Sequence, residues 1–106
     1  MSRYETVFVL APHLSEEYVK IKVAKFRKVL TDRGAKIIFE ENWDRRGSGV
    51  QLLTEERWAS LEKKDAGYYQ LFEFTTDTSF VITELEIAFK RDEWVLRFMT
   101  VKLDRH

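Results

Sequence analysis

Apolar residues in the first third of the chain follow two different periods. Residues 4–10 are rich in β-branched and aromatic side chains and end shortly before Pro12, which is typical of a β-strand. Ser15 is a suitable helix N-cap, and Gly34 is a suitable residue to follow a helix. The apolar positions between them recur every three or four residues, as one face of a helix requires. They are Val19, Val23, Phe26 and Leu30.

The same alternation of periods continues to the end of the chain. Residues 35–42, 68–75 and 95–103 each predict a strand, and Asp77 or Thr78 can cap a second helix between the last two. The apolar stripe of this helix contains Val81 or Ile82, Leu85, Ala88 and Phe89. The order β-α-β-β-α-β predicts an α+β fold of the ferredoxin-like, split β-α-β type, a four-stranded antiparallel sheet with two helices on one face.

This arrangement predicts a core between the helices and the sheet. Six residues are expected there: Phe8, Phe26, Leu30, Ile37, Leu85 and Phe98. The strands are apolar on their other face as well, whereas a sheet with one covered face should alternate apolar with polar residues. Apolar residues on that face predict a docking surface for a partner. The candidates are Val7, Val9, Met99 and Val101.

Length and composition limit the classes of function. The 106 residues predict a single domain, 1–106, and 18 basic against 18 acidic residues give no net charge. Binding to nucleic acid or membrane by bulk charge is therefore not expected, although a local basic patch is compatible with this balance. The chain has no cysteine and no apolar run of membrane-spanning length, and its opening residues predict no signal peptide.

Catalytic and metal chemistry finds little support in the sequence. His13 and His106 are the only histidines, and they are far apart, so no metal site or cofactor is expected. Ser15 is better explained as a helix cap than as a nucleophile, and Gly47-Ser48-Gly49 lacks the residues that complete a phosphate loop. The chain is not expected to be an enzyme or to bind a small-molecule substrate.

Several segments, in collinear order, resemble one protein family. They are residues 4–10, Arg33-Gly34-Ala35, Glu41-Asn42-Trp43, residues 67–74, Phe89-Lys90-Arg91-Asp92-Glu93 and residues 97–104. Together they resemble the bacterial ribosomal protein S6 family, in the form found in Bacteroidetes. The resemblance implies a ferredoxin-like fold, a cytoplasmic location on the ribosome, and binding of 16S ribosomal RNA together with ribosomal protein S18.

The resemblance also implies which side chains meet RNA, through phosphate pairing or base stacking. Its candidates are Arg3, Tyr4, Arg45, Arg46, Arg91 and Arg97. For each arginine, an ordinary solvated surface charge is an equally good interpretation. Trp94 stands where the family often has a basic residue, which weakens the patch around Arg91.

Residues 44–61 depart from the family pattern. Gly47-Ser48-Gly49 reads as a flexible connector, and residues 47–61 read as an insertion. Thr54 can cap a short helix over residues 54–64, with Trp58 and Leu61 on one face as further partner-binding candidates. Two interpretations remain: a natural insertion in a ribosomal protein, or an engineered scaffold whose inserted segment, about residues 50–61, presents a peptide or binding surface to an antibody or designed partner.

Overall fold

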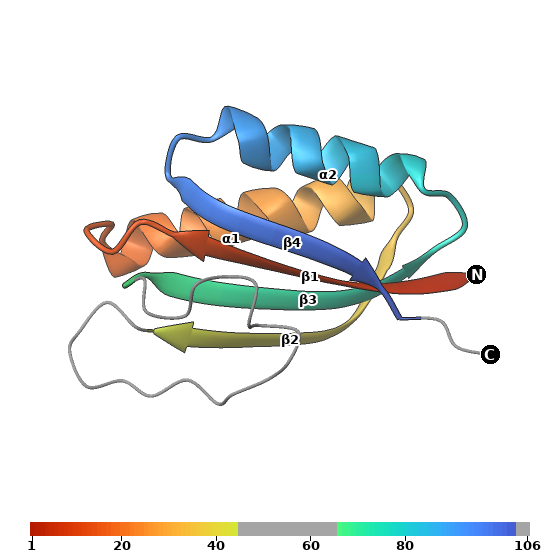
Figure 1. The fold of residues 1–106 in the computed structure, drawn as a ribbon, viewed down its shortest axis with the longest axis horizontal. Helices are drawn as coiled ribbons and strands as arrows, with labels where there is room; N and C mark the ends of the chain where they lie inside the picture. The colour runs from red at the N-terminus through yellow and green to blue at the C-terminus, as the bar shows by residue number, and fades with distance from the viewer. Residues whose placement is uncertain (45–65, 104–106) are drawn as a thin grey trace.

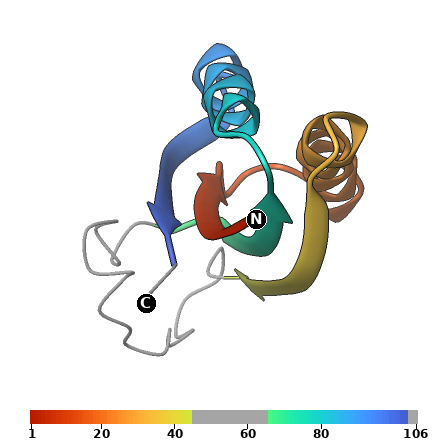
Figure 2. The ribbon, with the colours of Figure 1, turned by 90° about the vertical axis from the view of Figure 1, so that its right-hand side faces the viewer.

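The computed structural model describes residues 1–44 and 66–103 (Figure 1). Its four strands are β1 (Ser2–Leu10), β2 (Lys36–Asp44), β3 (Tyr68–Thr76) and β4 (Val95–Lys102). They form one antiparallel sheet in the order β2-β3-β1-β4. The helices are α1 (Glu16–Asp32) and α2 (Phe80–Arg91), and both lie on the same side of the curved sheet (Figure 2). The predicted α+β, ferredoxin-like fold is confirmed.

Helix α1 begins and ends where the sequence predicts. The Ser15 side chain accepts a hydrogen bond from the backbone N–H of Tyr18 at 3.1 Å, which satisfies one of the free donors of the first turn. At the other end, the N–H of Ala35 donates to the carbonyl of Leu30 at 3.0 Å, and the N–H of Gly34 donates to the carbonyl of Thr31 at 3.1 Å. Gly34 has φ +87°, which glycine adopts most easily. This pattern is a Schellman motif.

Helix α2 begins one or two residues later than the predicted caps. Its N-cap is Ser79, which makes no side-chain capping hydrogen bond, so the assignment to Asp77 or Thr78 was wrong. The reason is a local turn: the Thr76 hydroxyl accepts the N–H of Thr78 at 3.3 Å, and the Thr78 hydroxyl accepts the N–H of Phe80 at 3.1 Å. The first bond holds Thr78 in the turn before the helix, and the second satisfies a free first-turn donor from the residue before the N-cap.

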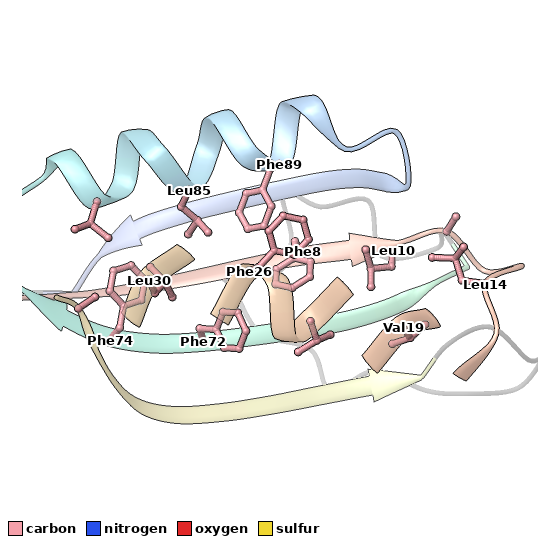
Figure 3. Close-up of a cluster of buried hydrophobic side chains, with 14 residues drawn as sticks. Phe8, Leu10, Leu14, Val19, Phe26, Leu30, Phe72, Phe74, Leu85 and Phe89 are labelled. Carbon is pink, nitrogen blue, oxygen red and sulfur yellow. The ribbon is translucent and has the colours of Figure 1, made fainter. Parts of the chain in front are cut away.

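The core between the helices and the sheet is dominated by aromatic rings. Phe8 of β1 lies 5.0 Å from Phe26 of α1 and 4.9 Å from Phe89 of α2, measured between ring centroids (Figure 3). Of the six predicted core residues, Phe8, Phe26, Leu30 and Leu85 are buried in this cluster, and Ile37 and Phe98 pack against it half-buried. The predicted core is therefore confirmed, with two members at its margin.

The sheet face away from the helices carries a second, smaller apolar cluster. Its fully buried members are Val7, Val9, Tyr69 and Leu71, and Trp43 and Met99 pack against it. The alternation that places Phe8 among the helices places its neighbours Val7 and Val9 on this opposite face. Both faces of the central strands are thus apolar, as their sequence indicates.

The entry into β3 lies very close to the end of β1. A Cβ atom on Gly67 would lie 2.6 Å from the carbonyl oxygen of Leu10 and 2.7 Å from a methyl carbon of Val9, so only glycine allows this approach.

The predicted short helix over residues 54–64 lies outside the described residues. No helix in the described part of the chain is long and apolar enough to cross a membrane.

Candidate nucleic-acid interface

The first two RNA candidates, although adjacent in sequence, lie on opposite faces of the sheet. Tyr4 is half-buried on the helix side, where its ring stacks on Phe74 with centroids 5.8 Å apart. Arg3 lies on the other side, and its Nε forms an ion pair of 3.0 Å with Glu73 of β3. The Arg3 side chain as a whole is 45% exposed.

The arginines do not form a single patch. Arg97 is exposed on β4 and pairs in register with Val9, six residues along β1 from Arg3. Six residues of strand correspond to about 20 Å. Arg91 is exposed at the end of α2, on the helix side of the molecule. Arg45 and Arg46 lie outside the described residues, so the structure does not place them.

The partner-binding candidates divide in the same way. Val7 is 1% exposed and Val9 is 0% exposed, so neither presents surface to a partner in this structure. Met99 and Val101 of β4 are half-buried and retain accessible surface at the edge of the sheet. Trp58 and Leu61 lie outside the described residues. Any contact through the described candidates would therefore fall on β4.

A charged cluster that the sequence analysis missed lies at the end of α2. Asp92 is 5% exposed, and its Oδ2 accepts hydrogen bonds from Lys22 Nζ at 2.8 Å and Lys25 Nζ at 3.0 Å, both from α1. Its Oδ1 accepts the backbone N–H of Trp94 at 2.9 Å. One carboxylate thus joins the first helix to the connection between α2 and β4 and places two ammonium groups side by side.

The environment of Asp92 keeps its carboxylate ionised. Burial alone would raise its pKa, but the hydrogen bonds from Lys22, the Trp94 N–H and Lys25 outweigh burial, and the net pKa of Asp92 is lowered. The two lysines therefore face a fixed negative charge at neutral pH. Because two positive charges meet one negative charge, this trio keeps a net positive charge.

Aromatic side chains surround the same cluster. The Nζ of Lys22 lies 5.4 Å from the centroid of the Tyr18 ring, and Trp94 meets His13 edge-on at 4.9 Å. Tyr18, Lys22 and Lys25 are spaced four and three residues apart, so they share one face of α1. This spacing was a usable signal in the sequence. The link to residues 91–94 was not, because it joins segments about 70 residues apart, as in the Lys22–Asp92 pair.

Comparison with known proteins gives one consistent family. Residues 3–102 match the model of the family described as ribosomal protein S6. The "Small ribosomal subunit protein bS6" of Phocaeicola vulgatus is 46% identical over 106 residues, which is 100% of this chain and 84% of that protein. The protein of the same name from Flavobacterium psychrophilum is 43% identical, over 100% of this chain and 85% of its own.

Solved structures agree on the fold. The 30S ribosomal protein S6 from Thermotoga maritima superimposes with a TM-score of 0.74 at 24% identity, covering 96% of this chain and 87% of that chain. The P2 domain of a chemotaxis kinase, solved in complex with its response regulator, gives a TM-score of 0.51 at 10% identity, over 96% of this chain and 98% of that chain. The fold alone therefore does not distinguish a ribosomal protein from a signalling domain.

The alignments also bear on the atypical segment. The relatives match across all 106 residues, so residues 44–61 fall within the aligned range, and the engineered-scaffold interpretation is not borne out. The resemblance drawn from the sequence, including its Bacteroidetes-like form, is confirmed. Because the family model matches residues 3–102 and the relatives are more than 40% identical over the whole chain, the chain belongs to the ribosomal protein S6 family and is a structural ribosomal protein, not an enzyme.

Proposed function

We propose that this chain binds 16S ribosomal RNA within the small ribosomal subunit, as a heterodimer with ribosomal protein S18, in the cytoplasm. The observation that supports this most strongly is the 46% identity, over the whole chain, to a protein named as a small ribosomal subunit component. The ferredoxin-like fold is compatible with this role but does not by itself select it.

The distribution of charge favours binding with a partner. The chain carries no net charge, so nonspecific attraction to the phosphate backbone is weak. Its exposed cations on described elements lie on both sides of the sheet, with Arg91 on the helix side and Arg3 and Arg97 on the other. Phosphate contacts position a protein on a nucleic acid but carry no sequence information directly. We therefore expect a second protein to supply part of the binding surface. Met99 and Val101 on β4 offer apolar surface for that protein.

A binding assay tests this proposal directly. Labelled 16S ribosomal RNA of the central domain would be titrated with the chain alone, with S18 alone, and with both proteins at several salt concentrations. We expect tight and saturable binding only with both proteins present. Tight binding of arbitrary RNA by the isolated chain, or no contribution of the chain when S18 is present, would contradict the proposal.

Assembly in the cell gives an independent check. A tagged copy of the full chain should migrate with small ribosomal subunits in a sucrose gradient and should leave that fraction when the subunits are dissociated with EDTA and high salt. A correctly folded chain that stays at the top of the gradient would argue against a ribosomal location.

A further inference from the structure

The surface hollow at the junction of α1 with the connection from α2 to β4 has the composition of a nucleotide site. Its volume is about 330 Å³. Its lining combines three cations, two anions and two aromatic residues: Tyr18, Lys22, Lys25, Arg91, Asp92, Glu93 and Trp94. Cations pair with phosphate, and aromatic rings stack on unpaired bases. The hollow brings both chemistries to one place.

The cations of this hollow are held in position, and two of them remain accessible for a further contact. Lys22 is mostly buried and serves Asp92, whereas the Lys25 side chain is 48% exposed and can direct its other N–H donors outward. Arg91 is exposed and forms no ion pair among the residues that the structure describes. The lining contains three cationic side chains and two anionic ones, so its formal charge is one net positive charge.

A second hollow of similar size provides a contrast. It lies between α1 and β2, with a volume of about 330 Å³, and its arginine is Arg27. Its guanidinium forms a bidentate ion pair with Glu40, with Nε 2.8 Å from Oε2 and Nη2 2.9 Å from Oε1. The hydrogen bond to Glu40 raises the pKa of Arg27. The carboxylate of Glu40 therefore occupies the guanidinium of Arg27, whereas the exposed side chain of Arg91 can bind a phosphate.

The aromatic side chains are accessible to a ligand. Tyr18 is 41% exposed on the outer face of α1. Trp94 is half-buried. Its backbone N–H donates to Asp92 and its ring packs edge-to-face with His13, so the ring forms a fixed wall of the hollow. RNA uses both kinds of group, because its phosphates pair with cations and its unpaired bases stack on aromatic rings.

From this geometry we propose that the hollow binds one unpaired nucleotide of RNA. Its phosphate lies between Lys25 and Arg91, and its base packs against Tyr18 and Trp94. The proposal rests on the proposed RNA-binding function and names a contact within it. Of these four residues, only Arg91 is also among the candidates taken from the family resemblance.

Matched substitutions test the two halves of the site separately. Arg91→Ala removes a proposed phosphate contact, and Lys90→Ala makes the same change in charge at an exposed neighbour that does not line the hollow. In titrations of the central-domain RNA with S18 present, we expect Arg91→Ala to weaken binding and to reduce the salt slope by about one. Lys90→Ala should leave both quantities unchanged.

Tyr18→Ala removes the proposed stacking platform, and Ile21→Ala is its control because Ile21 is 56% exposed on the same helix. We expect Tyr18→Ala to weaken binding roughly fivefold or more with an unchanged salt slope, since stacking is not an ionic contact. Ile21→Ala should bind like the wild type. In a Trp43→Phe, Trp58→Phe background, RNA should quench the fluorescence of Trp94.

The outcomes separate this inference from the broader function. If the wild type binds RNA with S18 but the Arg91 and Lys90 variants behave alike, or Tyr18→Ala binds normally, the nucleotide site is wrong and the ribosomal function stands. If Arg91→Ala weakens the binding of S18 in the absence of RNA, the hollow holds a protein segment instead. If the wild type binds no RNA at all, both proposals fail. Circular dichroism confirms that each variant is folded.

Discussion

The two faces of the sheet are both apolar, but they are built differently. The helix face is filled with phenylalanine rings from five elements, with neighbouring centroids 4.8 to 5.7 Å apart. The far face has a smaller cluster of Val7, Val9, Tyr69 and Leu71, and the charged pair Arg3 and Glu73 lies towards one end. Burial by helices thus accounts fully for the first face. The second face combines a hydrophobic centre with charges, as surfaces that meet other molecules do.

The largest effect should come from the helix face. Phe26→Ala removes a fully buried ring that contacts Phe8 and Phe89, and we expect it to lower the free energy of unfolding by about 3–5 kcal/mol. Urea denaturation measures this loss. Ile21→Ala, on the exposed side of the same helix, should change stability by less than about 0.5 kcal/mol. A loss below about 1 kcal/mol for Phe26→Ala would refute the packing described for this face.

The next effect concerns the buried carboxylate that ties α1 to the end of α2. Asp92→Asn weakens the contacts to Lys22 and Lys25, and we expect a loss of about 1–3 kcal/mol at pH 7. Asp32→Asn, in the exposed pair with Lys28, should cost far less.

The pH dependence of this effect has a defined sign. Because the folded-state pKa of Asp92 is lowered, its contribution to stability is complete above the ordinary aspartate pKa and is lost as the pH falls through the lower folded-state value. The stability difference between wild type and Asp92→Asn should therefore be constant from pH 7 to 5 and shrink only in stronger acid. A difference that disappears between pH 7 and 5 would show that Asp92 is not held ionised.

The far face should contribute less, but measurably. Val9→Ala removes two methyl groups from a position with 0% exposure, and we expect a loss of about 1.5–2 kcal/mol. Val101→Ala, half-buried on the same face, should cost less than half as much. If Val9→Ala proves neutral in the isolated chain, the second cluster stabilises little, and the two faces differ more than their burial indicates.

The smallest effect belongs to the charges of the far face. Glu73→Gln breaks the ion pair with Arg3, but Glu73 also lies opposite the buried Glu5 in the register of β1 and β3. Loss of the attraction and relief of like-charge repulsion oppose each other, so we expect a change within about 0.5 kcal/mol. Thermal unfolding at low and high salt measures it. A loss above about 1.5 kcal/mol would show that this ion pair is structural.

The sequence predicted the fold better than the candidate site. Helix α1 could be bounded to the residue because Ser15 and Gly34 act through local backbone geometry. The start of α2 was missed because the Thr76 hydroxyl accepts the N–H of Thr78 in a turn that precedes the helix, which propensity alone does not resolve. Period-2 alternation implies that the neighbours Arg3 and Tyr4 face opposite sides of the sheet, but it does not show that β3 supplies their partners Glu73 and Phe74. The sequence spacing could place Lys22 and Lys25 on one face of α1, but it could not link them to Asp92, because that link is a tertiary contact between distant segments.

The close approach of Gly67 to the end of β1 has an evolutionary consequence. Tyr68 pairs in register with Leu10 on one side and with Asp44 on the other, so the strands on both sides of residues 45–65 are aligned by contacts of their own. The entropy of closing a chain between two fixed ends grows slowly, by about 0.6 kcal/mol for each doubling of its length. Descendants of an ancestral gene can therefore gain or lose residues between Asp44 and Gly67 without moving a single strand pairing. Selection can change that segment while the sheet is inherited intact, provided that position 67 remains glycine.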